Sequence, residues 1–247
     1  MDPLGVEITT LTGVYSISAS RSLNTVGAAT LSFFDDVNPD FLGQDYRIGI
    51  YRNNYLLGDT HWLIKKKIKL IDSWRVECKD TLSILSDRIV SYARETNFSE
   101  KTIEYGLEAP ADYLMKAFMR ENLGTLATDT TRDLSDYLAI EDDLSLGPTL
   151  EKSASQQIIM NVLSSLASDS QANGTELYFD VRPGPSRLFF FVKSGHLGVD
   201  NQEIVFGPEY NNLQDAQIQW NYENEKSVIY VGGYGRGAEQ IIRKVED

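Results

Sequence analysis

The sequence predicts a mostly β protein of the α+β class, in which strand-rich ends surround a helical middle. From residue 7 to residue 99, apolar residues recur at every second position in several segments, as in strands that bury one face. Two later segments carry apolar residues at the three- and four-residue spacing of helices. After Gly174 the two-residue spacing returns, which indicates further strands near the C-terminus.

The N-terminal region holds the clearest strand patterns. In residues 15–20, Tyr15, Ile17 and Ala19 alternate with serines, which predicts one buried face. The apolar residues of the long strand expected at 62–70, all predicted on one face, are Trp62, Ile64, Ile68 and Leu70. Other strands are expected at residues 29–33, 46–50, 55–57 and 74–78, with a turn at Asn53-Asn54. Strands at this density predict a small barrel or sandwich.

The segment from Ser73 to Tyr92 changes its period halfway. Trp74, Val76 and Cys78 have strand spacing, whereas Leu82, Leu85 and Ile89 have helical spacing. Asp80 stands at the change and is expected to cap the helix by accepting a bond from a free backbone N–H. A strand that leads directly into a short helix can close one end of a barrel.

The middle of the chain predicts two helices. The first begins near Pro110, because proline is tolerated in the first turn, and ends near Gly124 as its C-cap. The second has an apolar face from Ile158 to Leu166. Two hairpins are expected after it: residues 176–181 with 188–192, and residues 217–222 with 227–231.

Composition and charge exclude several functions. The chain has 247 residues and a net charge of −13, which argues against binding nucleic acid by neutralising its phosphates. No apolar run is long enough to cross a bilayer, so we expect no membrane insertion by this chain. The single cysteine, Cys78, cannot form an internal disulfide, which fits assembly in a reducing compartment.

The sequence offers little for metal binding or catalysis. Its two histidines, His61 and His196, are predicted to be loop residues, and no spacing of metal ligands is present. No nucleophile motif occurs, and adjacent acids such as Asp35-Asp36 and Asp142-Asp143 are expected by chance in so acidic a chain. We therefore expect no enzymatic activity and no catalytic, cofactor-binding or metal-binding residue.

Two other motifs have structural interpretations. The run Gly232–Gly237 lacks the lysine of a phosphate-binding loop and is expected to serve backbone geometry. The basic cluster of Lys65, Lys66, Lys67 and Lys69 alternates along a predicted strand. It is expected to be a solvated face or to meet an acidic patch of a partner.

Several stretches together resemble the hub proteins at the distal end of long-tailed bacteriophages. These are relatives of the baseplate hubs of contractile phages and of the spike bases of injection systems. The stretches, which span nearly the whole chain, are Arg21–Asn24 with Gly27 and Leu31, Trp74–Val90, Tyr113–Gly124, Phe206–Leu213 and Ser227–Gln240.

The resemblance implies two tail-tube-like β-barrels per subunit, and a ring of three subunits that continues the tail tube. It implies a first barrel at residues 1–100, a helical and hairpin insertion at residues 101–204, and the start of a second barrel at residues 205–247. The family continues well past the glycine run, so the second barrel is expected to be short here or completed by another chain.

The function implied is that of a structural virion protein, a tail-tip or baseplate hub subunit assembled in the host bacterial cytoplasm. Its expected partners are copies of itself, tail-tube proteins, and fibre, spike or tip proteins, with DNA only in transit. We also expect a neutral to acidic bore, with the lysine cluster facing outward. The alternatives are a carbohydrate- or receptor-binding accessory, indicated by exposed Trp220, Tyr222 or Tyr234, and a cell-wall or capsule hydrolase.

Overall fold

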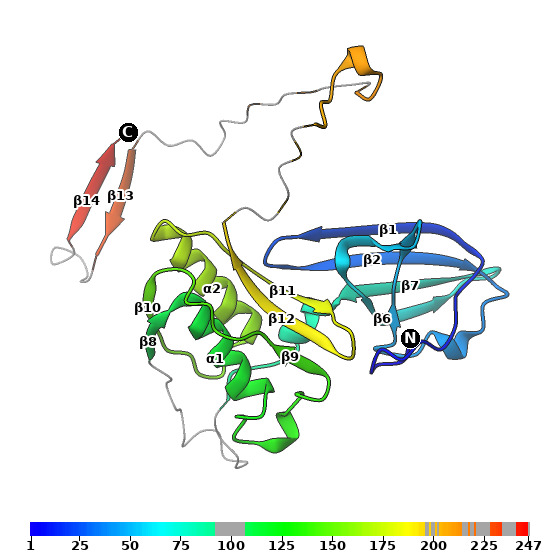
Figure 1. Cartoon of the computed structure of the whole chain (residues 1–247), viewed down its shortest axis with the longest axis horizontal. Coiled ribbons are helices and arrows are strands. Elements are labelled where there is room, and N and C mark those ends of the chain that lie inside the picture. Colours follow the sequence, from blue (N-terminus) through cyan, green and yellow to red (C-terminus); the bar gives the residue numbers. More distant parts are fainter. Residues whose placement is uncertain are drawn as a thin grey trace. The chain divides into compact units, whose positions relative to one another are not determined.

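The chain begins with a five-stranded antiparallel sheet that curls into an open half-barrel (Figure 1). Its strand order is β1-β2-β7-β6-β3, so β1 and β3 are the two edges. The bounds are β1 Val14–Ser22, β2 Thr25–Phe34, β3 Arg47–Ile48, β6 Trp62–Lys69 and β7 Ser73–Asp80. Between β3 and β6, β4 (Tyr51–Arg52) and β5 (Tyr55–Leu56) form a small hairpin. Its turn is Asn53-Asn54, as predicted, and both asparagines have positive φ.

This computed structural model describes residues 1–91, 107–195, 198, 201, 203–213, 217, 220, 228–233 and 241–246. The chain divides into two compact units, Met1–Gly198 and Val199–Asp247. The half-barrel and an α/β layer make up the first unit. The boundaries predicted at residues 100 and 204 stay a prediction.

The core of the half-barrel comes from the alternating faces of its central strands. Leu31 and Phe33 of β2 pack with Val76 and Cys78 of β7, all buried as the alternation predicted. Trp62 and Ile64 of β6 join the same cluster.

The predicted face of β6 is confirmed for Trp62 and Ile64 but is wrong for its second half, and the buried face predicted for β1 is wrong. A register shift between Ile64 and Lys66 places Lys67, not Ile68, opposite the buried Val76, so the second half of β6 turns over. Leu70, expected in the core, is exposed. At the edge, Tyr15 and Ile17 of β1 are 51% and 49% exposed, because this end of the open sheet has no second layer over it.

The helix predicted after Asp80 is a 3-10 helix, η3, of residues Thr81–Leu85. Asp80 precedes it but makes no side-chain cap bond, which corrects the sequence prediction. Its carboxylate is instead engaged by Arg21. Ile89, expected on the helical stripe, is exposed.

The α/β layer packs two helices against a three-stranded sheet (Figure 1). The helices are α1 (Ala111–Leu123) and α2 (Ile159–Ala172). The sheet has the order β11-β12-β9, with β11 (Leu177–Pro183) antiparallel and β9 (Leu138–Ile140) parallel to β12 (Leu188–Ser194). A further pair joins β8 (Leu107–Pro110) to β10 (Thr149–Lys152). The helices and the β11–β12 hairpin confirm the predictions for this region.

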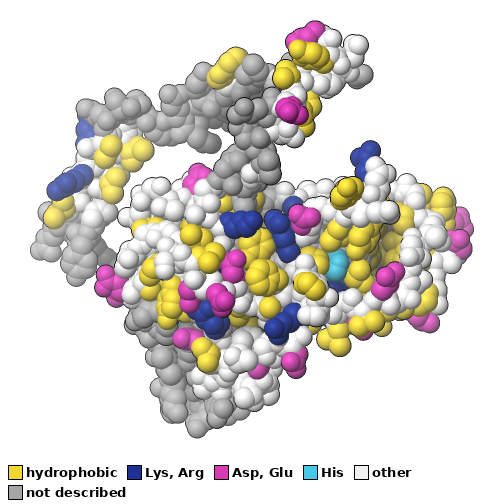
Figure 2. Space-filling view, in the orientation of Figure 1, with side chains coloured by type: hydrophobic (Ala, Val, Ile, Leu, Met, Phe, Trp, Pro, Cys, Tyr) yellow, Lys and Arg dark blue, Asp and Glu magenta, His cyan; other side chains and the backbone are white. Residues whose placement is uncertain are grey.

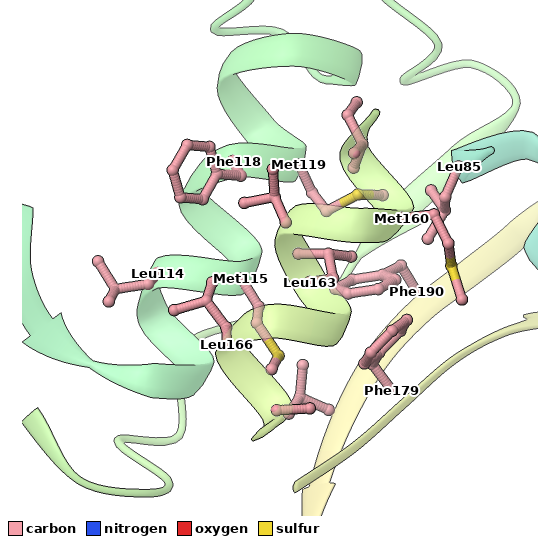
Figure 3. Packing of buried hydrophobic residues seen from close by; sticks show 14 of the residues in the cluster. Leu85, Leu114, Met115, Phe118, Met119, Met160, Leu163, Leu166, Phe179 and Phe190 are labelled. Atoms are coloured by element: carbon pink, nitrogen blue, oxygen red, sulfur yellow. The ribbon is translucent and has the colours of Figure 1, made fainter. Parts of the chain in front are cut away.

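The core of the layer lies between the helices and the sheet. Figure 3 shows Met115 of α1 near Leu163 of α2, with Phe179 and Phe190 of the strands beyond them; Phe118 belongs to the same buried cluster but lies on the other side of α1 in this view. At the end of α1, Gly124 is the C-cap, and a Cβ there would lie 2.9 Å from the Arg120 carbonyl oxygen. The residue type is therefore dictated by close backbone approach.

Among the described residues of the second unit, β13 (Val228–Gly232) and β14 (Ile242–Glu246) form a hairpin. The hairpin predicted from residues 217–222 falls largely outside the described residues, as does most of the glycine run. The remaining elements are the 3-10 helices η1 Pro39–Phe41, η2 Leu57–Asp59, η4 Thr130–Arg132 and η5 Pro208–Tyr210.

Candidate functional site

The concave side of the half-barrel forms a hollow of about 530 Å³. Its lining includes Ile17, Leu31 and Phe33 from β1 and β2, and Ile50 after β3, with residues 7–11 along one side. Figure 2 shows hydrophobic side chains gathered in this hollow. Apolar side chains that line an open depression are typical of surfaces that another chain covers.

Strand β1 is an edge strand that has few of the features that usually protect such a strand from pairing. It is nine residues long and bonds to β2 alone among the described strands. Natural proteins usually protect such an edge with lysine, proline or a very short strand, because its free N–H and C=O groups recruit other strands. The sequence VYSISASRS has neither lysine nor proline, although its register with β2 shifts near both ends, and the Tyr15 ring lies tilted at 4.9 Å from the ring of the exposed Phe34. The geometry is that of a strand open to pairing.

Arg47 is buried at the rim of the hollow. Its guanidinium carbon lies 4.5 Å from the centre of the Tyr137 ring, which joins the half-barrel to the α/β layer. The Nε and Nη2 atoms are buried and have no hydrogen-bond partner within the described part of the chain. The Met1 amino group donates to the Arg47 carbonyl at 3.0 Å, so residues before the first strand are held against this rim.

Neither His61 nor Cys78 is placed for chemistry. His61 lies just before β6 but is buried, and burial beside the positive charge of Arg47 lowers its pKa to about 4. Burial raises the pKa of the Cys78 thiol to about 12, which leaves almost no thiolate at neutral pH. His196 lies outside the described residues.

The turn between β1 and β2 fastens the half-barrel to the α/β layer. Arg21 donates from Nε to Asp80 at 3.0 Å and from Nη2 to Asp180 of β11 at 2.7 Å. Asn24 donates to the Leu177 carbonyl and accepts from the Phe179 N–H, both at 2.9 Å. Its amide thus bonds to β11 as the backbone of a neighbouring strand does.

The buried Asp80 shows how much this junction depends on Arg21. Burial raises the pKa of Asp80, and the hydrogen bond from Arg21 works in the opposite direction. Next to it, Thr81 donates its hydroxyl to the Val181 carbonyl at 2.5 Å. Sequence reasoning missed this network, because Asp80 was interpreted as a cap and Asp180 carried no signal; only the Arg21–Asn24 motif pointed to it.

The basic cluster does not form a free positive patch. Lys65 pairs with Asp45 at 2.8 Å and with Asp87 at 3.1 Å. The other three lysines also have acceptors in the chain: Lys66 has Glu77, Lys67 the Pro39 carbonyl, and Lys69 Asp35. These contacts within the chain explain the alternating lysines, so an acidic patch on a partner protein is not needed to explain them.

The acidic pairs have structural partners as well. Asp143 forms a bidentate pair with Arg120 at 2.8 and 3.0 Å, and the Asp142 carbonyl accepts from Lys116 at 2.6 Å. No group of three histidine, cysteine or acidic residues in the described ranges could hold a metal ion. Nor is any described helix both long and apolar enough to cross a membrane.

The aromatic residues proposed for a binding accessory are only partly described. Trp220 is 69% exposed, whereas Tyr222 and Tyr234 lie outside the described residues. One exposed indole does not establish a platform, so this alternative stays a prediction.

The fold is that of bacteriophage tail proteins. The 43 kDa tail protein of prophage MuSo2 from Shewanella oneidensis aligns with a TM-score of 0.51 and 11% identity, over 95% of this chain and 68% of that one. A tail protein of Neisseria meningitidis MC58 has a TM-score of 0.48 and 11% identity, over 94% and 62%. Prophage tail protein gp18 of Listeria monocytogenes EGD-e has a TM-score of 0.45 and 12% identity, over 76% and 48%.

The amino-acid sequence assigns the chain to a specific protein family. Residues 64–247 match the family model described as Siphovirus ReqiPepy6 Gp37-like protein, so the chain belongs to this family. No curated protein matches it. The chain spans about half the length of the Listeria protein.

Proposed function

We propose that this siphovirus protein is a structural component of the virion, a tail-tip hub subunit. Copies of it form a ring of three that continues the tail tube and joins it to the host-recognition apparatus. The observation that carries this proposal is the open half-barrel, whose edge strand β1 and apolar hollow are both unprotected. An edge of this kind is an aggregation hazard in a monomer but a requirement in a ring.

The second unit supports the same proposal. Its hairpin exposes Val228, Ile229, Tyr230 and Val231, four consecutive apolar residues that leave apolar side chains on both faces. A strand with two apolar faces is typical of the interior of a layered sheet. Since a two-stranded hairpin is marginally stable alone, we expect it to add to a larger sheet in the assembled tail.

Passage of DNA constrains the inner wall of such a ring. A bore rich in unpaired lysine would release counterions and retain the polyanion, whereas a neutral or acidic bore lets it slide. The net charge of −13 and the intrachain partners of the lysine cluster both favour the second arrangement. The other partners proposed are tail-tube proteins and fibre, spike or tip proteins.

The proposal is tested by disabling the edge strand without disturbing the fold. Ile17→Lys adds a charge to β1 at a side chain that is half exposed, and Ile71→Lys adds the same charge at a side chain that is 91% exposed in the β6–β7 turn. We expect Ile17→Lys to prevent assembly of the ring, measured by analytical ultracentrifugation and electron microscopy of tails, and Ile71→Lys to assemble normally.

Two results contradict the proposal. One is normal tails that carry Ile17→Lys. The other is a wild-type tail in which this protein is an isolated peripheral monomer.

A further inference from the structure

A second depression lies on the α/β layer, on the face of the β11-β12-β9 sheet that the helices do not cover. It encloses about 540 Å³, and its lining includes Phe189, Phe191 and the Pro183–Pro185 turn. The Phe189 and Phe191 rings stack with centroids 6.3 Å apart and planes 17° from parallel. The floor of this groove is therefore aromatic and flat.

The rim of the groove is positively charged in a chain that is strongly acidic overall. Lys193 approaches the Phe191 ring at 5.7 Å, and Arg187 donates to the Ser135 carbonyl; neither is paired with a carboxylate among the residues described. Arg182, 4.9 Å over Phe191, already bonds to Asp180.

The one acidic residue of the lining, Glu141, is already engaged. Its carboxylate pairs with the buried Lys116 at 3.0 Å and accepts from the Val192 N–H at 3.2 Å. The groove thus presents two cations that have no carboxylate partner within the described ranges, beside an apolar floor.

The short strand along one side of this groove has a partly open edge, where the Leu138 N–H is already bonded to the Leu134 carbonyl at 2.7 Å. Within the described chain β9 pairs with β12 alone, and Ala139 of β9 lines the groove. An extended peptide can add to such an edge through its backbone, while alternate side chains enter the adjacent groove. Side chains two positions apart on a strand point to the same face, so an apolar residue and an acid at that spacing reach the floor and the rim together.

We propose that this groove binds an extended segment of a partner protein in which carboxylate and apolar side chains alternate on one face. The carboxylates meet Lys193 and Arg187, and the apolar side chains cover Phe189. This inference is independent of the ring, because it uses neither β1 nor the hollow of the half-barrel. A single strand of nucleic acid offers bases that stack on an aromatic floor and phosphates for the cations, but the net charge of −13 of the chain repels it.

The test uses the full chain and three fluorescein-labelled probes followed by anisotropy. They are a capped peptide TLTETLTETL, its lysine counterpart TLTKTLTKTL, and an oligothymidylate. Arg187→Glu with Lys193→Glu reverses the rim, and Lys193→Glu alone spares the Ser135 contact in case the double variant fails to fold. The matched control is Lys66→Glu with Lys79→Glu, two exposed lysines on the half-barrel.

We expect the acidic peptide to bind about tenfold more tightly than the lysine peptide, and the rim variants to weaken it by about tenfold or more. The control variant should bind like the wild type. The proposal is overturned if the acidic peptide does not bind, if both peptides bind equally, or if rim reversal leaves binding unchanged. Tighter binding of the oligothymidylate would identify a nucleic-acid site instead and equally overturn it.

Discussion

The half-barrel and the α/β layer bury their apolar residues to very different extents. In the α/β layer the apolar stripes of both helices are covered on the inner side, and Leu114, Phe118, Val162 and Leu163 have no exposed surface. In the half-barrel, Tyr15 and Ile17 of the edge strand are half exposed and the concave face is open. One region therefore completes its own core, whereas the other leaves part of its apolar face open, as the proposed ring requires.

The largest effect is expected in the polar centre of the α/β layer. Asp112 is fully buried, accepts from Leu144 N–H at 2.9 Å and Leu146 N–H at 2.7 Å, and pairs with the buried Lys116 at 3.3 Å. Asp112→Ala leaves a buried cation without this carboxylate, which should cost about 3–5 kcal/mol of unfolding free energy. Urea denaturation measures it. Asp143→Ala, which removes a partly exposed partner of Arg120, should cost less than about 1 kcal/mol. Equal losses would mean that the layer is not organised around Asp112.

The next effect compares the two regions directly. Leu163→Ala opens a cavity between α2 and the sheet and should cost about 2–5 kcal/mol. Ile17→Ala removes a similar number of carbons from β1 but should cost the isolated subunit less than about 0.5 kcal/mol, because that side chain is already in water. Both are measured by urea denaturation of the monomer. If Ile17→Ala were as costly as Leu163→Ala, the half-barrel would be a closed core and the comparison would fail.

A smaller effect is expected where the two regions meet. Asn24→Ala leaves the Leu177 carbonyl and the Phe179 N–H of β11 without their side-chain partner, at a cost of about 1–3 kcal/mol. Hydrogen exchange should show faster exchange of the Phe179 amide. Ser22→Ala, at an exposed position in the same turn, is the control and should change neither quantity. Unchanged protection of Phe179 would indicate that the junction rests on Arg21 and Thr81 instead.

The last effect is a pH dependence that His61 adds to the half-barrel. Its pKa is about 4 in the folded protein and about 6.5 when unfolded, so the unfolded state binds more protons between these values. Stability from this group is therefore present above pH 6.5 and is lost as the pH falls toward 4. His61→Gln should lose less stability than the wild type between pH 7 and pH 5, measured by thermal unfolding. Carboxylates such as Asp80 titrate in both proteins, so parallel pH profiles would rule out the contribution of His61.

The sequence predicted the parts whose structure depends on local pattern. The apolar residues around Phe118 and around Leu163 predicted both helices, because a 3.6-residue period of apolar residues is not compatible with a strand. The two-residue period also predicted strand β1. It did not predict that Tyr15 is half exposed, because alternation indicates a strand with two different faces and not which element covers each face. The shift after Ile64 was invisible for a related reason: one extra residue in a strand changes the face of Ile68 without changing its residue type.

The junction could not be predicted from pattern. Asp80 has the sequence context of a helix cap, and only the approach of Arg21, 59 positions away in the chain, redirects its carboxylate. Asp180 and Asn24 meet Arg21 and β11 across still greater separations. Side-chain partners at such distances depend on the tertiary arrangement and leave no periodic trace. The same applies to the groove on β12, where Arg182 of β11 lies over Phe191 only because β11 and β12 are paired.

The side-chain amide of Asn24 affects which strand edges of this protein are open to pairing. It bonds to the Leu177 carbonyl and to the Phe179 N–H, so these two backbone groups of the β11 edge cannot pair with another strand. This part of the β11 edge is therefore closed to a further strand, whereas β1 pairs on one side only among the described strands. In the ring proposed above, a neighbouring subunit would therefore pair at β1 and not at β11.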